Sequence, residues 1–317
     1  MKFFDFMLQR LHESMRSLHF EHGERLLRTI VYGWCLLSIV VLLPAASVFW
    51  GPGAYRTWLH KNEPYGLFSD LDLLARPSIG PYYLVVIAAF LGSLVAGLCR
   101  VAPRTTAVLN YVLYHVICAQ AQAIHDGGDR FIGQLLFYLM LASLATVENP
   151  TRHPIRTLIR NLAFFSTRIQ LCVVYASAAL AKLGGDSWPT GKAMYYVLHN
   201  EEYTLPIVQH TIGANGLLLA IATYGVVLFQ LSVPYLIWRN PTRRPIMLIG
   251  TFLHLQIAFI MGLMSFGFAM IVGYAAFYTD EEARAIVVRW ASRIERIRPK
   301  WCTTSALGAI ELSSRGS

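Results

Sequence analysis

Three polar residues recur at every seventh position of one apolar segment and are the first candidates for chemistry. Arg168, Tyr175 and Lys182 share one face of an α-helix at this spacing. Lys182 lies at the end of the apolar run 173–183, where a cation costs roughly 2.5–3.5 kcal/mol at the bilayer centre and less near the interface. A lysine in a dry pocket gives up its proton readily and can act as a base. The alternative is that Arg168 and Lys182 only anchor the two helix ends at opposite membrane surfaces.

Two histidines lie in other apolar segments. His254 is inside the run 252–257, and His115 shares a helix face with Tyr111 and Gln122. A histidine within a membrane either hydrogen-bonds a neighbouring helix or relays protons and contacts a substrate. The sequence leaves both interpretations open.

The segment 125–129, His-Asp-Gly-Gly-Asp, is the densest polar cluster between apolar runs. Its glycines predict a tight turn, and Asp129 can begin the helix that follows as a capping residue. His125, Asp126 and Asp129 offer metal ligands, but the sequence has no HxxxH or HExxH spacing, so we predict no metal site. Phosphate-binding glycine motifs and GxSxG are also absent, which leaves nucleotide binding and serine hydrolysis without support.

The composition is that of a membrane protein. Of the 317 residues, 55% are hydrophobic and 14% are charged, whereas soluble proteins carry about 25% charged residues. The net charge of +9 comes from arginines in short connecting segments, a distribution that points to membrane topology and anionic lipids. No nucleic-acid recognition module accompanies the charge, so we predict no nucleic-acid partner.

Apolar runs of about 20 residues can each cross the bilayer, and the sequence predicts an all-α, polytopic bundle of about eight transmembrane helices. The expected spans are 28–50, 81–99, 105–124, 131–147, 163–183, 214–238, 244–262 and 264–279. The last two are short and could form a hairpin or a re-entrant pair. Basic residues gather in alternate connections, which predicts cytoplasmic termini and an outer, functional face made of 51–80, 125–130 and 184–213.

The chain divides into three predicted regions. Residues 1–24 are expected to form an interfacial amphipathic helix, 25–280 the transmembrane domain, and 281–317 a basic amphipathic helix with a flexible tail. We expect no cleavable signal peptide and a multi-pass protein of the cell inner (plasma) membrane. The five cysteines fall outside the predicted outer loops, so no structural disulfide is expected.

The residues that follow the polar stripe resemble a known family. Arg168-Ile169-Gln170, Ala181-Lys182-Leu183 and Asp186-Ser187-Trp188, with Gly191 beyond, are similar to the signature of the HTTM domain. That membrane domain is shared by vitamin K-dependent gamma-carboxylase and many bacterial proteins, including short ones of the sporulation-delaying-protein B type. His254 followed by Gly262 and Phe266 resembles a second part of the family pattern. The resemblance covers about residues 25–280.

The resemblance implies a role for individual residues. Lys182 matches the lysine regarded as the base for vitamin K hydroquinone deprotonation, and His254 matches a pocket histidine. Three departures speak against peptide glutamate carboxylation. The family's Asn-His pair is absent near Gly128-Asp129, Ala179 replaces a usual glycine, and the chain ends soon after the last span, where the carboxylase continues into a large lumenal domain.

These features lead to an HTTM-like membrane enzyme or maturation factor with an outward-facing pocket for an apolar or peptide substrate. Lys182 is the expected base, carboxylase-like chemistry the expected type, and a quinone or vitamin K-like hydroquinone the expected cofactor. His254 is expected to relay protons. The expected substrate- or cofactor-binding residues are Arg168, Gln170, Tyr175, Asp186, Trp188, His115, Asp129 and Phe266. The alternative is a non-catalytic membrane subunit or scaffold that binds lipid, a peptide or a membrane-protein partner. A transporter has less support, because broken-helix inverted repeats are absent.

Overall fold

The computed structural model describes residues 13–52, 54, 74, 80–121, 124–200, 204, 206–211 and 213–297, and all regular structure in these residues is helical. The α-helices are α2 (Glu21–Leu42), α3 (Ala46–Trp50), α5 (Tyr83–Leu98), α6 (Pro103–Gln120), α7 (Gly127–Leu144), α8 (Pro154–Leu183), α9 (Ala193–Leu198), α10 (Pro206–Thr211), α11 (Gly216–Leu236), α12 (Asn240–Ile260), α13 (Met264–Gly273) and α14 (Asp280–Ile297). Short 3-10 helices are η1 (Leu43–Ala45), η4 (Gly80–Tyr82), η6 (Pro150–Arg152) and η7 (Tyr274–Phe277). The all-α prediction is confirmed.

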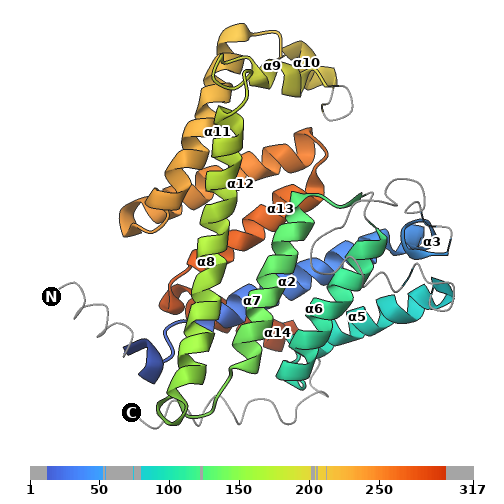
Figure 1. Cartoon of the computed structure of the whole chain (residues 1–317), viewed down its shortest axis with the longest axis vertical. Coiled ribbons are helices and arrows are strands. Elements are labelled where there is room, and N and C mark those ends of the chain that lie inside the picture. Colours follow the sequence, from blue (N-terminus) through green and yellow to red (C-terminus); the bar gives the residue numbers. More distant parts are fainter. Residues whose placement is uncertain are drawn as a thin grey trace.

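The helices form one bundle of mostly antiparallel neighbours (Figure 1). α8 packs between α7 and α11, α6 packs between α5 and α7, and α13 packs against both α7 and α12. The helix ends that were predicted to face outward lie toward the top and the right of Figure 1, with the end of α8 and the start of α11 at the top and α3 at the right. The segment with α9 and α10 lies over the start of α11 at the top.

Within the described residues, four helical segments are long and apolar enough to cross a membrane: Glu21–Trp50, Gly80–Leu98, Pro154–Leu183 and Gly216–Leu236. The other predicted spans correspond to α6, α7, α12 and the shorter apolar segment Met264–Phe277. α6, α7 and α12 carry polar residues that lower their hydropathy, and several of these turn inward. Asn110 of α6 is fully buried and accepts a hydrogen bond from the Ser93 hydroxyl at 2.6 Å.

The predicted interfacial helix over 1–24 falls in part outside the described residues. Residues 1–12 lie outside the described residues, residues 13–16 form one helical turn, and residue 21 already belongs to α2. Asn161 of α8 holds this segment in place, because its amide donates to the carbonyls of Ser14 and Ser17 at 2.9 and 2.8 Å. A local hydrophobic pattern could not show this contact, which joins residues about 145 positions apart.

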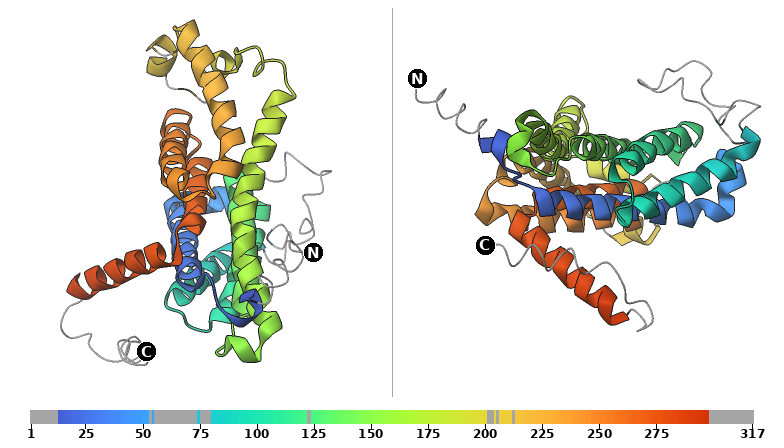
Figure 2. Two further views of the ribbon diagram at one scale, coloured as in Figure 1. Left: turned by 90° about the vertical axis from the view of Figure 1, so that its left-hand side faces the viewer. Right: turned by 90° about the horizontal axis from the view of Figure 1, so that it is seen from below.

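α14 begins at Asp280, whose carboxylate ties it to the start of α2. The carboxylate accepts from the backbone N–H groups of His22 and Gly23 at 2.7 and 2.9 Å and lies 2.8 Å from His22 Nδ1. From this junction α14 extends away from the bundle (Figure 2). In the predicted region 281–317, the helical part corresponds to α14, and residues 298–317, which include the predicted tail, lie outside the described residues.

Candidate functional site

A buried hydrogen-bonded cluster joins α8, α12 and η7. The Tyr175 hydroxyl lies 2.6 Å from His254 Nε2 and hydrogen-bonds the Tyr274 hydroxyl. Tyr175 and His254 are only 1% and 2% exposed. Within the described residues, His254 Nδ1 has no hydrogen-bond partner, which is uncommon for a buried polar atom. The cluster therefore contains one buried ring nitrogen, His254 Nδ1, that makes no hydrogen bond within the described residues.

Close packing defines the space around this cluster. Phe266 of α13 contacts the His254 ring edge-on with centroids 5.6 Å apart, and Phe229 of α11 contacts the Tyr175 ring. Gly250 makes room for Tyr274, because a Cβ at this position would lie 2.6 Å from Tyr274 Cζ. The structure thus brings together His254, Tyr175 and Phe266, three of the residues predicted to form the site.

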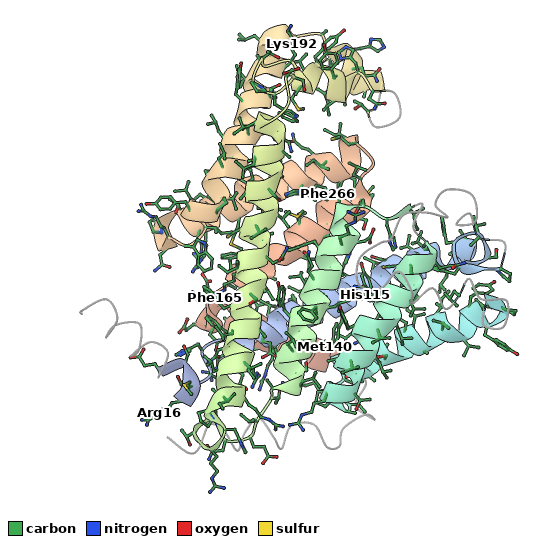
Figure 3. All side chains as sticks on the ribbon, in the orientation of Figure 1. Arg16, His115, Met140, Phe165, Lys192 and Phe266 are labelled. Atoms are coloured by element: carbon green, nitrogen blue, oxygen red, sulfur yellow. The ribbon has the colours of Figure 1, made fainter. Side chains whose placement is uncertain are left out.

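The turn 125–129 ties the start of α7 to the start of α13. Asp126 caps α7, and its carboxylate also accepts from the Phe266 backbone N–H at 3.0 Å. Asp129 completes the capping box and accepts from the Ser265 hydroxyl at 3.0 Å. Gly128 allows this approach, because a Cβ there would lie 2.6 Å from Phe266 Cα. The prediction of a helix-capping loop is confirmed, but the N-cap is Asp126 and not Asp129. Figure 3 shows Phe266 beside this turn.

A pocket of about 410 Å³ lies next to this turn, in the range of 300–1,000 Å³ typical of small-molecule sites. Its walls come from α2, α6, α13 and the residues around the turn. Most lining residues are apolar or aromatic, and the polar ones include Ser38, His125, Asp129, Tyr114 and Ser265. The hydroxyls of Tyr114 and Ser265 donate to the carbonyl and the carboxylate of Asp129. Leu37, Val41, Ile124 and Met264 line the pocket and are 38–65% exposed on the outer surface. An apolar molecule could therefore enter from the side of the bundle.

His125 lies at the polar end of the pocket, between α6 and α7. Burial lowers the pKa of His125 from 6.5 to about 4, outweighing the nearby Asp126 carboxylate, which acts in the opposite direction. Arg130 and His115 lower it further. Burial, followed by the neighbouring Asp129, raises the pKa of Asp126. The imidazole of His125 is therefore neutral at pH 7 and can accept or donate a hydrogen bond in the pocket.

The lowered pKa of His125 predicts a loss of stability in acid. Its contribution is fully present above pH 6.5 and is lost as the pH falls toward about 4, because the folded state must then take up a charge in a half-buried position. Thermal unfolding of the detergent-solubilised protein between pH 7 and pH 4 measures this. Replacing His125 by Gln is expected to flatten the profile over this interval. A profile of equal slope in both proteins would contradict the prediction.

Lys182, Asp186 and Trp188 lie where α8 ends, on the side of the bundle that was predicted to face outward. Lys182 Nζ is 5.0 Å from the Trp188 ring centroid. Lys182 is half-buried and has no carboxylate or hydrogen-bond partner among the described residues, while Asp186 is exposed. Lys182 lies seven residues beyond Tyr175, about 10 Å along the helix axis. Neither Lys182 nor His254 lines the pocket near His125, so both predicted catalytic residues lie outside that pocket.

Of three other predicted site residues, Arg168 and Gln170 make contacts between helices, whereas His115 contacts the backbone of its own helix. Arg168 donates to the Ala276 carbonyl at 2.7 Å and lies over the Phe20 ring at 4.5 Å. Gln170 accepts from the Tyr138 hydroxyl at 3.3 Å. His115 Nδ1 is 2.8 Å from the Tyr111 carbonyl, and Figure 3 shows His115 on α6. Arg168 therefore holds the C-terminal end of η7, a role that its periodic spacing did not indicate.

Sequence reasoning missed two residues of the site. Tyr274 was counted only as part of the last apolar span, and Asp126 only as a turn residue and a possible metal ligand, although both make polar contacts that connect helices. Two free cysteines, Cys35 and Cys118, also line the pocket. Among the described residues no group of three or more His, Cys, Asp or Glu side chains could hold a metal ion.

The sequence matches the HTTM domain over residues 56–281, well over half of its length. The chain belongs to the HTTM-domain family. It is 29% identical over 189 residues to the uncharacterised protein YitO of Bacillus subtilis (strain 168), covering 53% of this chain and 58% of that protein. It is 26% identical over 203 residues to sporulation-delaying protein SdpB of the same organism, covering 60% of this chain and 62% of that protein. The chain thus matches about three fifths of the length of each relative. No solved structure gives a significant match.

Family membership agrees with the resemblance of the segment from Arg168 to Trp188. The HTTM match and the apolar helices identify an integral membrane protein of this family. Residues of α2, α6, α7 and α13 enclose the pocket. α8 carries Tyr175 and Lys182 about 10 Å apart along its axis.

Proposed function

We propose that this HTTM-family protein is a membrane enzyme or maturation factor that binds an apolar molecule in the pocket near His125 and transfers protons at the outer side of the bundle. The observation that carries the proposal is the pocket itself. It combines largely apolar walls with a small polar end at which His125, Asp129 and Tyr114 meet. Such a combination is typical of sites that bind an apolar molecule and orient one reactive group.

The residues of the pocket fit a quinone or an apolar peptide segment. Trp34 and Trp50 supply flat aromatic surface, and the exposed rim residues Leu37 and Val41 permit entry from the membrane. Asp129 is held by Ser265 and by the Asp126 backbone N–H at 3.1 Å, so its carboxylate is oriented before any ligand binds. A bound hydroquinone would supply an ionisable hydroxyl group. Neutral His125 and the carboxylate of Asp129 can accept a hydrogen bond from such a group.

The base is a separate part of the proposal, and the family resemblance gives that role to Lys182. Its half-buried amine without a carboxylate partner in the described part of the chain suits a group that must lose a proton. Since Lys182 does not line the pocket, this role requires the reacting group of the substrate to lie at the outer helix ends. Inner-membrane location, carboxylase-like chemistry and a vitamin K-like cofactor are parts of this proposal.

Replacing Lys182 by Arg tests the base directly. Arginine stays protonated but can keep the contact with the Trp188 ring, so we expect unchanged abundance and a change in unfolding free energy within about 0.5 kcal/mol. Oxidation of a reduced short-chain naphthoquinone by dissolved oxygen, followed with an oxygen electrode, is expected to fall to the background rate. Full activity of Lys182→Arg would show that Lys182 anchors the helix at the membrane surface and is not the base.

Ligand binding in the pocket is tested by filling it. Ala121 lines the pocket and is 4% exposed, so Ala121→Phe should occupy the space of a ligand. Ala89 is exposed on α5, and Ala89→Phe adds the same group outside the pocket as a matched control. Native mass spectrometry identifies any co-purifying molecule, and quenching of Trp34 and Trp50 fluorescence reports a titrated short-chain naphthoquinone.

We expect Ala121→Phe to lose the ligand and the quenching while Ala89→Phe keeps both. Equal binding by the two variants would overturn the pocket assignment. Loss of binding in Lys182→Ala alone would move the ligand to the end of α8. A wild-type protein that neither retains a molecule nor binds the naphthoquinone would overturn the catalytic proposal.

The second candidate function is a non-catalytic subunit that binds lipid, a peptide or a membrane-protein partner. One observation favours it: the contact of Lys182 with Trp188 is the arrangement expected of an anchor at the membrane surface. In that case Lys182→Arg and Ala121→Phe would both leave assembly with the partner unchanged.

A further inference from the structure

A second cavity, a groove of about 590 Å³, lies on the predicted cytoplasmic side. It occupies the angle where α14 leaves the bundle, between α14, α12 and the helices α13 and η7 (Figure 2). One wall is apolar and includes Leu248, Phe268 and Ile271. Leu248 is 70% exposed, so this wall is continuous with the outer surface of the bundle.

Three arginines, Arg243, Arg244 and Arg289, line the same groove against a single carboxylate, Glu282. Arg243 and Arg244 both donate to Glu282, at 3.1 and 2.6 Å, and the Thr279 backbone N–H donates to it at 2.8 Å. Partial burial alone would raise the pKa of Glu282, but these donors outweigh it and hold the pKa below its ordinary value. The Glu282 carboxylate is therefore ionised, and both of its oxygens accept hydrogen bonds.

A positive charge remains after these contacts are made. The Arg244 side chain is 74% exposed. Arg289 lies two turns after Glu282 on α14, is exposed, and has no ion-pair partner among the described residues. The groove thus has one apolar wall and one unneutralised basic end. In a membrane protein this pairing complements a lipid that carries a negative headgroup and an acyl chain.

We propose that this groove binds one anionic phospholipid, with the phosphate on Arg244 and Arg289 and an acyl chain along Leu248 and Ile271. The lipid would complete the contact between α14 and the bundle. The proposal does not depend on the pocket near His125, because the two cavities share only Phe268, and either can fail without the other.

The test compares lipid binding by charge variants. Delipidated protein in a nonionic detergent is titrated with phosphatidylglycerol and with phosphatidylcholine, and bound lipid is counted by native mass spectrometry. The double variant Arg244→Gln/Arg289→Gln is expected to bind phosphatidylglycerol about tenfold or more weakly. The control Arg152→Gln/Arg156→Gln removes two exposed arginines near the start of α8 and is expected to bind as the wild type does.

A third variant tests the apolar part of the groove without changing charge. Thr251 lines the groove, and Thr251→Trp should exclude the acyl chain and weaken phosphatidylglycerol binding. If Arg152→Gln/Arg156→Gln weakened phosphatidylglycerol binding equally, general surface charge and not this groove would be what attracts the lipid. Competition by millimolar inorganic phosphate would show a free-anion site instead of a lipid site. Equal binding of both lipids, or unchanged binding in Arg244→Gln/Arg289→Gln, would overturn the proposal.

Discussion

Replacing Glu24 by glutamine is expected to lower the free energy of unfolding by about 3–5 kcal/mol. Glu24 is 3% exposed and bonds two arginines, Arg28 of its own helix and Arg160 of α8, the latter at 2.7 Å. The two arginine side chains are themselves only 18% and 11% exposed. Glutamine keeps the shape but removes the charge, so two poorly hydrated cations would lose their counterion.

The same helix offers a matched control. Glu21 pairs with Arg25 at the same spacing of four residues, but these side chains are 39% and 37% exposed. Exposed pairs of this kind contribute about 0.3–0.5 kcal/mol, so Glu21→Gln should have little effect. Unfolding in mixed micelles with increasing SDS, followed by tryptophan fluorescence, compares the two variants. Similar midpoints for Glu24→Gln and the wild type would show that the buried network does not stabilise the bundle.

The Glu24 network also shows where sequence reasoning stopped. Arg28 and Arg160 were interpreted as positively charged residues that set the topology. Glu24 lies four residues before Arg28, but nothing in the local sequence indicates that its carboxylate is buried or that Arg160 shares it. Their shared partner Glu24 is 136 residues from Arg160 along the chain. A contact at this distance follows only from the packing of α2 against α8, which hydrophobic periodicity does not determine.

Patterns within a single helix were predicted with more success. The seven-residue spacing in α8 placed Tyr175 on an inward face, and Tyr175 is buried. The turn 125–129 was predicted as a helix-capping loop with Asp129 as the capping residue. The structure contains a capping box in which Asp126 is the N-cap and Asp129 the third residue of the helix. Whether a helix face forms a binding site is a different question, because the pocket needs walls from α2, α6 and α13 together. The role of Lys182 in the family pattern accordingly stays a prediction.

The second large effect is expected at Gly250, where alanine should destabilise the protein by about 1–3 kcal/mol. The added Cβ would lie 2.6 Å from Tyr274 Cζ and closer still to its hydroxyl oxygen. Tyr274 is 3% exposed and packed in the core, so it cannot swing into solvent. The ring must shift, and the shift breaks its hydrogen bond to Tyr175, which also contacts His254.

Helix propensity alone predicts the opposite sign, because alanine is favoured over glycine within a helix by about 1 kcal/mol. Gly225 of α11 has no atom within 4 Å of a Cβ built there, so Gly225→Ala should be neutral or stabilising and serves as the control. Unfolding in mixed micelles with increasing SDS measures the change in stability of Gly250→Ala and of Gly225→Ala under the same conditions. If Gly250→Ala were as stable as Gly225→Ala, the Tyr274 ring would not be fixed against α12. The Tyr175–Tyr274–His254 cluster would then be too loosely held to orient a proton at the centre of the bundle.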